Sequence, residues 1–139
     1  MNGTGYVSVL INDITMTELT YKQKIAMMRI LLDLVLADER VDERESTYFV
    51  EIAKLLDLKE DAKIDVDKKN SLLALCEIQD FTREEKEMFA KMMGKMIVVD
   101  EDINYNEVCV YNVVNDFCKI NVGFQIEDYP QYTLSGEVL

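Results

Sequence analysis

Two acidic segments of the chain carry side chains that could bind a cation or a basic partner. The first, DERVDERE, covers residues 38–45, and the second, DEDINYNE, covers residues 100–107. Each follows an apolar run, and carboxylates are the ligands that Ca²⁺ and Mg²⁺ prefer in proteins. A weak divalent-cation site is therefore one chemistry open to these segments. Its candidate ligands are Asp38, Asp42, Glu45, Asp100, Asp102 and Glu107.

The first segment resembles the second half of a calcium-binding EF-hand loop. Asp38, Val41 and Glu45 would stand at its fifth, eighth and twelfth positions. The first and third positions of such a loop should supply oxygen ligands, but Leu34 and Leu36 stand there. The sequence therefore excludes an EF-hand. A looser cluster of carboxylates stays open, with neighbouring arginines competing for the same oxygens as ion-pair partners.

The same acidic residues suit the beginnings of helices. In a capping box, a side chain accepts a hydrogen bond from a free backbone N–H, and a glutamate three positions later bonds back. Three pairs have this spacing: Asp42 with Glu45, Thr82 with Glu85, and Asn104 with Glu107. Each cap contributes about 1 kcal/mol relative to alanine. Capping and solvated charge are thus the alternative to cation binding.

The chemical inventory argues against an enzyme. The chain has no histidine, which removes the usual proton shuttle at neutral pH and the commonest transition-metal ligand. Its five glycines form neither GxxxxGK nor GxGxxG. A hydrolase using only carboxylates would need two facing acids in a pocket. We therefore assign no catalytic residue and expect no cofactor, leaving only the Ca²⁺ or Mg²⁺ hypothesis above.

The charge balance favours a basic protein partner. The chain has 27 acidic and 15 basic side chains, a net charge of −12. Such a field repels nucleic-acid phosphates and anionic lipid headgroups, whereas it attracts basic surfaces; keeping a small domain soluble is the other explanation. The sequence leaves homo-oligomerisation open. The candidate binding surface comprises Asp38, Glu39, Asp42, Glu45, Asp100, Glu101, Asp102 and Glu107.

The sequence favours a cytoplasmic location without membrane insertion. No uncharged apolar stretch reaches 18 residues, and the first residues have neither a basic start nor a cleavage-type end. The three cysteines, an odd number without a paired spacing, lie among apolar residues and are expected to be buried, reduced thiols. They are Cys76, Cys109 and Cys118.

Apolar residues recur at helical spacing, and the single proline is Pro130, so an all-α fold is expected. A short opening helix would contain Val7, Leu10, Ile11 and Ile14. Longer helices are expected over about residues 18–38, 43–57, 68–79, 83–100 and 105–119. The charged stretch KEDAKIDVDKKN is interpreted as a connection. The methionines of the range 83–100 are expected to fill the core rather than to line a peptide groove.

Helix, acidic turn and helix recur, because Asp100 follows Asp38 by 62 positions and the apolar faces keep the same register. The two copies, at about residues 18–58 and 83–121, are expected to pack as two pseudo-repeated helical hairpins. The prediction is a bundle of about six to seven helices over residues 1–122, with Leu34 and Met96 in its core. An irregular tail, residues 123–139, would pack on or near the bundle. Alternating helix directions places the two turns at opposite ends.

The duplicated pattern resembles the TerB-like family, named for tellurite resistance. The family's recurring element is an apolar helix, then A-D-G-x-(Ile/Val)-x-x-x-E, then a second apolar helix. The two copies here read LADERVDERESTYFVEIAKLLDL and VVDEDINYNEVCVYNVVNDFCKI. The resemblance implies a helical bundle in stress-linked complexes, cytoplasmic or close to a membrane, with no catalytic activity. Related domains include the N-terminal domain of a DnaJ-like membrane co-chaperone.

The chain departs from the family at the glycine of the turn. Glu39 stands there in the first copy and Glu101 in the second. Glycine serves at such positions because it accepts a positive φ after the end of a helix. Since glutamate disfavours that conformation, both turns are expected to be shaped differently from those of the family.

Overall fold

The computed structural model describes residues 19–99 and 101–129, and over these ranges it contains helices and no strand. The helices are α2 (Tyr21–Leu36), α3 (Glu43–Leu55), α4 (Ala62–Lys68), α5 (Ser71–Gln79), α6 (Arg83–Val98) and α7 (Tyr105–Phe117), followed by the short 3₁₀ helix η2 (Ile126–Asp128). The all-α prediction is confirmed. The predicted opening helix lies outside the described residues, as do Asp100 and the last ten residues of the tail.

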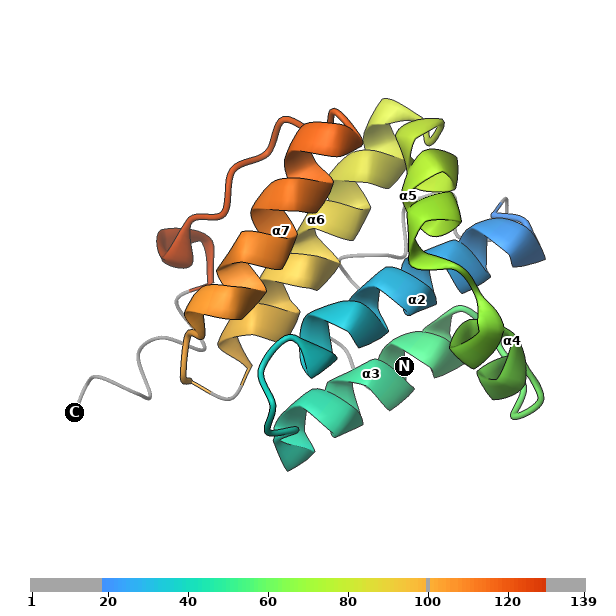
Figure 1. Cartoon of the computed structure of the whole chain (residues 1–139), viewed down its shortest axis with the longest axis horizontal. Coiled ribbons are helices and arrows are strands. Elements are labelled where there is room, and N and C mark those ends of the chain that lie inside the picture. The colour runs from blue at the N-terminus through green and yellow to red at the C-terminus, as the bar shows by residue number, and fades with distance from the viewer. Residues whose placement is uncertain (1–18, 100, 130–139) are drawn as a thin grey trace.

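Helix α2 occupies the centre of the bundle. It contacts all the other α-helices from α3 to α7, and Figure 1 shows it crossing the molecule with α3 on one side and α6 and α7 on the other. Its buried residues are Ile25, Ala26, Met27, Met28, Ile30, Leu31, Leu34 and Val35. Leu34 and Met96 are both completely buried, as the sequence predicts.

Helix α4 is the element that the sequence reading missed. It lies within the charged stretch that was interpreted as a connection, and only Ala62 and Val66 are buried on it. These two residues are one helical turn apart, so a single turn of apolar spacing is the whole sequence signal. The other predicted helices are found, with ends within a few residues of the predicted ones.

The bounds of two pairs of helices are related by a shift of 62 positions. When 62 is added to the first and last residue numbers of α2, the result is the bounds of α6. The same shift converts the bounds of α3 into those of α7. The helix starts correspond too, since Thr20 caps α2 and Thr82 caps α6, each in a capping box. Asp42 caps α3 in a capping box, as predicted, and Asn104 caps α7 by accepting from two backbone N–H groups.

The ends of α3 and α7 also share one conformation. Asp57 and Lys119, which are 62 positions apart, have positive φ angles of 59° and 57°. The next residue in each copy closes the helix, with 3.0 Å from Leu58 N to Ala53 O and 3.0 Å from Ile120 N to Asn115 O. This six-residue closure is the Schellman motif. These matches support the predicted repeat; its origin by duplication stays a prediction.

Residues 122–129 run over α6 and α7 and are held by aromatic packing. Tyr111 on α7 donates its hydroxyl to the Val122 carbonyl at 2.5 Å. Phe124 lies edge-on to Tyr111, with ring centroids 5.7 Å apart, and stacks on Tyr129 at 6.1 Å. Tyr129 is buried and lies directly against Gly94 of α6. The described part of the tail is therefore part of the packed structure.

The methionines of α6 fill the core, as the sequence predicts. The buried set comprises Met88, Met92, Met93 and Met96. The cysteines are free thiols, but the prediction that all three are buried is wrong. Cys118 is buried, Cys109 is half-buried and Cys76 is exposed. Cys76 is exposed because α5 turns only part of its apolar surface, including Ala74 and Ile78, towards the core.

We predict that Gly94→Ala destabilises the protein. A Cβ atom at this position would lie 1.9 Å from the Tyr129 hydroxyl, so the tyrosine must move out of its site. The free energy of unfolding should fall by about 1–3 kcal/mol, the usual range for overpacking. Urea unfolding measures it. Gly123→Ala is the matched control, because nothing lies within 4 Å of its Cβ. Equal stability of the two variants would contradict the packing.

Candidate functional site

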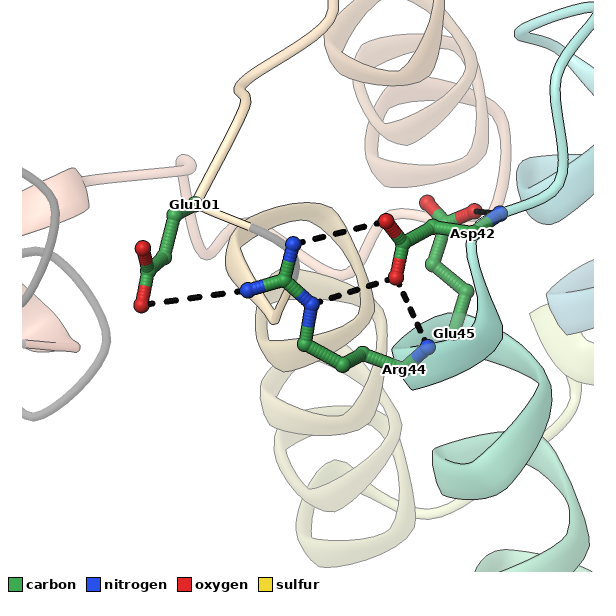
Figure 2. Close-up of polar contacts among 4 residues, drawn as sticks. All are labelled: Asp42, Arg44, Glu45 and Glu101. Atoms are coloured by element: carbon green, nitrogen blue, oxygen red, sulfur yellow. Dashed lines mark hydrogen bonds and ion pairs between the residues drawn. The ribbon is translucent and has the colours of Figure 1, made fainter.

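The structure brings the two acidic turns side by side. The Asn106 side chain of α7 donates to the Ala37 carbonyl at 3.2 Å, which joins the second hairpin to the first turn. Arg44 Nη1 also lies 3.9 Å from Glu101 Oε2 (Figure 2). The prediction that the turns lie at opposite ends is wrong. The missed helix α4 adds one chain reversal, so α2 and α6 run towards the same end of the bundle.

Arg44 links the two turns. Its Nε lies 3.2 Å and its Nη2 3.4 Å from the two Asp42 oxygens, while its backbone N–H donates to Asp42 Oδ1 at 2.7 Å. The side-chain bond from Arg44, with the backbone bond next, lowers the pKa of Asp42 below its usual value. Asp42 is therefore engaged as a helix cap and ion-pair partner. Figure 2 shows the guanidinium between Asp42 and Glu101, where it competes for oxygens that a cation would need.

Two of the candidate surface residues are buried. The exposed fraction is 0% for Glu45 and 1% for Glu107, so the expectation that they face solvent is wrong. Glu45 points back to its own cap, where its Oε1 accepts from Asp42 N at 3.2 Å. Because each glutamate lies in the first turn of its helix, capping geometry directs it inwards rather than towards solvent.

Lys95 is a buried cation that the sequence reading did not single out. It lies on α6 with an exposed fraction of 1%, and its Nζ is 5.7 Å from the centre of the Tyr48 ring on α3. Burial lowers the pKa of Lys95 to about 7, although the charge of Glu51 opposes the shift. The burial of Lys95 could have been predicted from the sequence, because this lysine lies inside the apolar run MMGKMIVV and helical spacing places it on the core side.

The remaining candidates lie on the paired turns and differ in exposure. Glu39, Glu101 and Asp102 are exposed, whereas Asp38 and Asp42 are half-buried. Asp100 is outside the described residues. Over the part of the chain that the structure describes, no three or more of His, Cys, Asp and Glu come together as metal ligands would. Cation binding by the six candidate carboxylates stays a prediction.

The second turn keeps the backbone conformation that suits the family's glycine. Glu101 has a φ of 66°, so the expectation that both turns avoid a positive φ is wrong for this copy. Glu39 is not among the described residues with positive φ, and there the expectation holds. A left-handed glutamate costs about 1 kcal/mol relative to glycine. The two turns are therefore adjacent without being identical in shape.

The comparison with protein families finds a match to the first part of the chain. Residues 11–68 match the family model described as "Tellurite resistance protein TerB". The match covers 58 of the 139 residues and includes α2, the first acidic turn, α3 and α4. No curated protein and no solved structure matches the chain. None of the described helices is long and apolar enough to cross a membrane.

We predict that Glu101→Gly stabilises the protein. Glycine adopts a positive φ without a steric penalty, so the free energy of unfolding should rise by about 0.5–1 kcal/mol. The ion pair lost with Arg44 is long and exposed, and it subtracts little. Glu39→Gly is the control and should be neutral or destabilising, since no such strain is relieved there. Destabilisation by both substitutions to the same extent would contradict the role of φ.

We predict that Lys95 makes stability depend on pH between 7 and 9. The unfolded chain keeps this proton up to the usual lysine pKa of 10.5, whereas the folded chain loses it near 7. The unfolded state therefore binds more protons across this window, and the free energy of unfolding rises with pH. The rise should be about 2 kcal/mol. Urea unfolding at each pH measures it, and Lys95→Met should flatten the profile. A wild-type profile that falls would contradict the lowered pKa.

Proposed function

We propose that the chain is a non-enzymatic, TerB-like interaction module that binds a basic segment of a partner protein through its paired acidic turns. The observation that carries the proposal is the contact between the turns, through Arg44 with Glu101 and Asn106 with Ala37. Either turn alone is a short helix junction with a few carboxylates. Together they make one acidic surface large enough to face several basic side chains.

The charge of the surface supports a basic partner. Two unit charges separated by less than a Debye length, about 8 Å at physiological salt, still interact through solvent. Carboxylates on adjacent turns reinforce one another within such distances, and the net charge of −12 adds a long-range field of the same sign. Such complementarity speeds association and selects partners more than it adds affinity. The binding is therefore expected to weaken steeply as salt is raised.

The family match supports the proposed setting. Because residues 11–68 match a family described by tellurite resistance, we place the module in a stress-response complex of the cytoplasm. The acidic turn that the match includes is the first half of the proposed surface. The second half is supplied by α6 and α7, outside the matched residues.

Divalent-cation binding by the same turns is the second candidate function. The observation that favours it is again the adjacency of the turns, since carboxylates of both copies could then share one ion. Isothermal titration of metal-free protein with Ca²⁺ and with Mg²⁺ tests it. Saturable binding heats that disappear in the double variant Asp38→Asn/Asp102→Asn would support cation binding. The absence of binding heat up to millimolar metal would contradict it.

Charge-neutralising variants test the partner proposal. Asp38→Asn, Glu39→Gln and Asp102→Asn together remove three negative charges from the paired turns without touching the cap at Asp42. Immobilised protein should capture a basic protein from an extract of its own cells at low salt, as identified by mass spectrometry. The triple variant should lose about 10-fold or more of that capture, because each exposed charge pair contributes about 0.2–1 kcal/mol.

A second triple variant controls for net charge. Asp57→Asn, Asp80→Asn and Asp116→Asn also remove three negative charges, from exposed positions at or near the ends of α3, α5 and α7, whereas the turns precede α3 and α7. This control should capture the partner as the wild type does. Equal loss in both triple variants would show that only net charge matters. If the wild-type protein captures no basic protein at low salt, the proposal is wrong.

A further inference from the structure

An apolar groove runs between α2, α3 and α4. It encloses a volume of about 670 Å³. Three large apolar side chains that line it, Leu36, Val41 and Val50, are each about half exposed, at 53%, 50% and 49%. The remaining apolar lining residues are Met28, Leu32, Val35, Phe49, Ala53, Leu58, Ala62 and Val66. A groove of this kind suits the apolar face of an amphipathic helix.

The rim of the groove is more basic than the rest of the chain. Lys54, Lys59 and Lys63 line it against Glu60 and Asp67, so its charged groups sum to one positive charge. The whole chain, by contrast, carries −12. An occupant that is apolar on one face and acidic at its edges would match both the lining and the rim.

We propose that the groove is the docking site of the chain's own N-terminal segment, residues 7–18. This segment has apolar residues at the helical positions Val7, Leu10, Ile11 and Ile14. Its only charged side chains are Asp13 and Glu18, and the first basic residue of the chain is Lys22. An aliphatic stripe with acidic flanks therefore complements an apolar groove with lysines on its rim.

The chain is long enough to reach the groove. Leu19 lies just before α2, and Met28 is the first residue of α2 that lines the groove. The distance between them is about 14 Å along a helix, at 1.5 Å per residue. Five residue steps from Leu19 back to Ile14 span up to about 16 Å when extended. A helix from Ile14 to Val7 is then about 10 Å long, close to the roughly 12 Å from Met28 to Leu36. The segment would run antiparallel to α2.

The extent of the family match supports the same arrangement. The match begins at residue 11, before α2, and ends at residue 68, the last residue of α4. Every residue that lines the groove falls inside this span, together with residues 11–18 of the proposed occupant. Docking of the segment is independent of partner binding at the acidic turns, so either proposal can fail without the other.

Nuclear Overhauser contacts in the full chain test the docking directly. With methyl-labelled isoleucine, cross-peaks are expected from Ile11 and Ile14 to the ring of Phe49, which lines the groove. An isotope-mixed sample distinguishes the occupants. Cross-peaks between differently labelled chains would assign the groove to a second copy and overturn the proposal. The absence of any contact between the segment and the groove would overturn it as well.

A matched pair of substitutions gives a second readout. Ile11→Asp places a charge on the apolar stripe, whereas Asn12→Asp adds the same charge on the opposite side of the predicted helix. Ile11→Asp should release the segment and raise the fluorescence of the apolar dye ANS at least 3-fold, with a cooperative thermal transition retained. Asn12→Asp should leave it at the wild-type value. Equal dye binding by the two variants would overturn the proposal.

Discussion

The packing of α2 against α3, α4, α5, α6 and α7 is the constraint on which the rest of the structure depends. Each fully buried Leu, Ile or Met contributes about 1.5–3 kcal/mol of apolar transfer free energy, and α2 carries eight buried residues. Because α3 to α7 all contact this helix, none of them can shift without exposing part of it. The directions of α2 and α6, and therefore the positions of the turns that follow them, are fixed by this packing.

The paired turns are a consequence of that arrangement. Two like-charged junctions would repel each other if nothing positive lay between them. Arg44 supplies the positive charge, and it is held by Asp42 while it faces Glu101. The hydrogen bond from Asn106 to Ala37 joins the turns without adding charge. A weak ion pair at the surface is thus combined with a neutral contact that salt does not screen.

Buried ionisable groups accompany this arrangement inside the bundle. Glu45 and Glu107 occupy corresponding positions of the two halves, and Lys95 lies inside on α6 next to Tyr48. Burial of a charge is costly unless other groups compensate it, so buried ionisable residues are weak evidence for net stability. The lowered pKa of Lys95 is the direct sign of that cost.

Much of the fold follows from the sequence alone. Apolar spacing of 3.6 residues predicts α2, α3, α5, α6 and α7, and the capping residues Asp42, Thr82 and Asn104 predict where three of them begin. These signals are local: each depends on residues within a turn or two of one another, and the backbone hydrogen bonds that they report are equally local. The burial of the α6 methionines follows from the same periodicity.

Only the tertiary structure decided which surfaces meet. A seven-residue helix with two buried side chains, α4, leaves almost no pattern in the sequence, yet it adds one more element to the path between α2 and α6, which run towards the same end of the bundle. The side-by-side turns, the Arg44 bridge and the groove all depend on this path or on packing between distant segments. The burial of Lys95 against Tyr48 is likewise set by a neighbour far along the chain. The stability of a helical turn depends mainly on residues close together in the sequence, so it can be predicted locally. The contacts between helices depend on residues far apart in the chain, so they cannot.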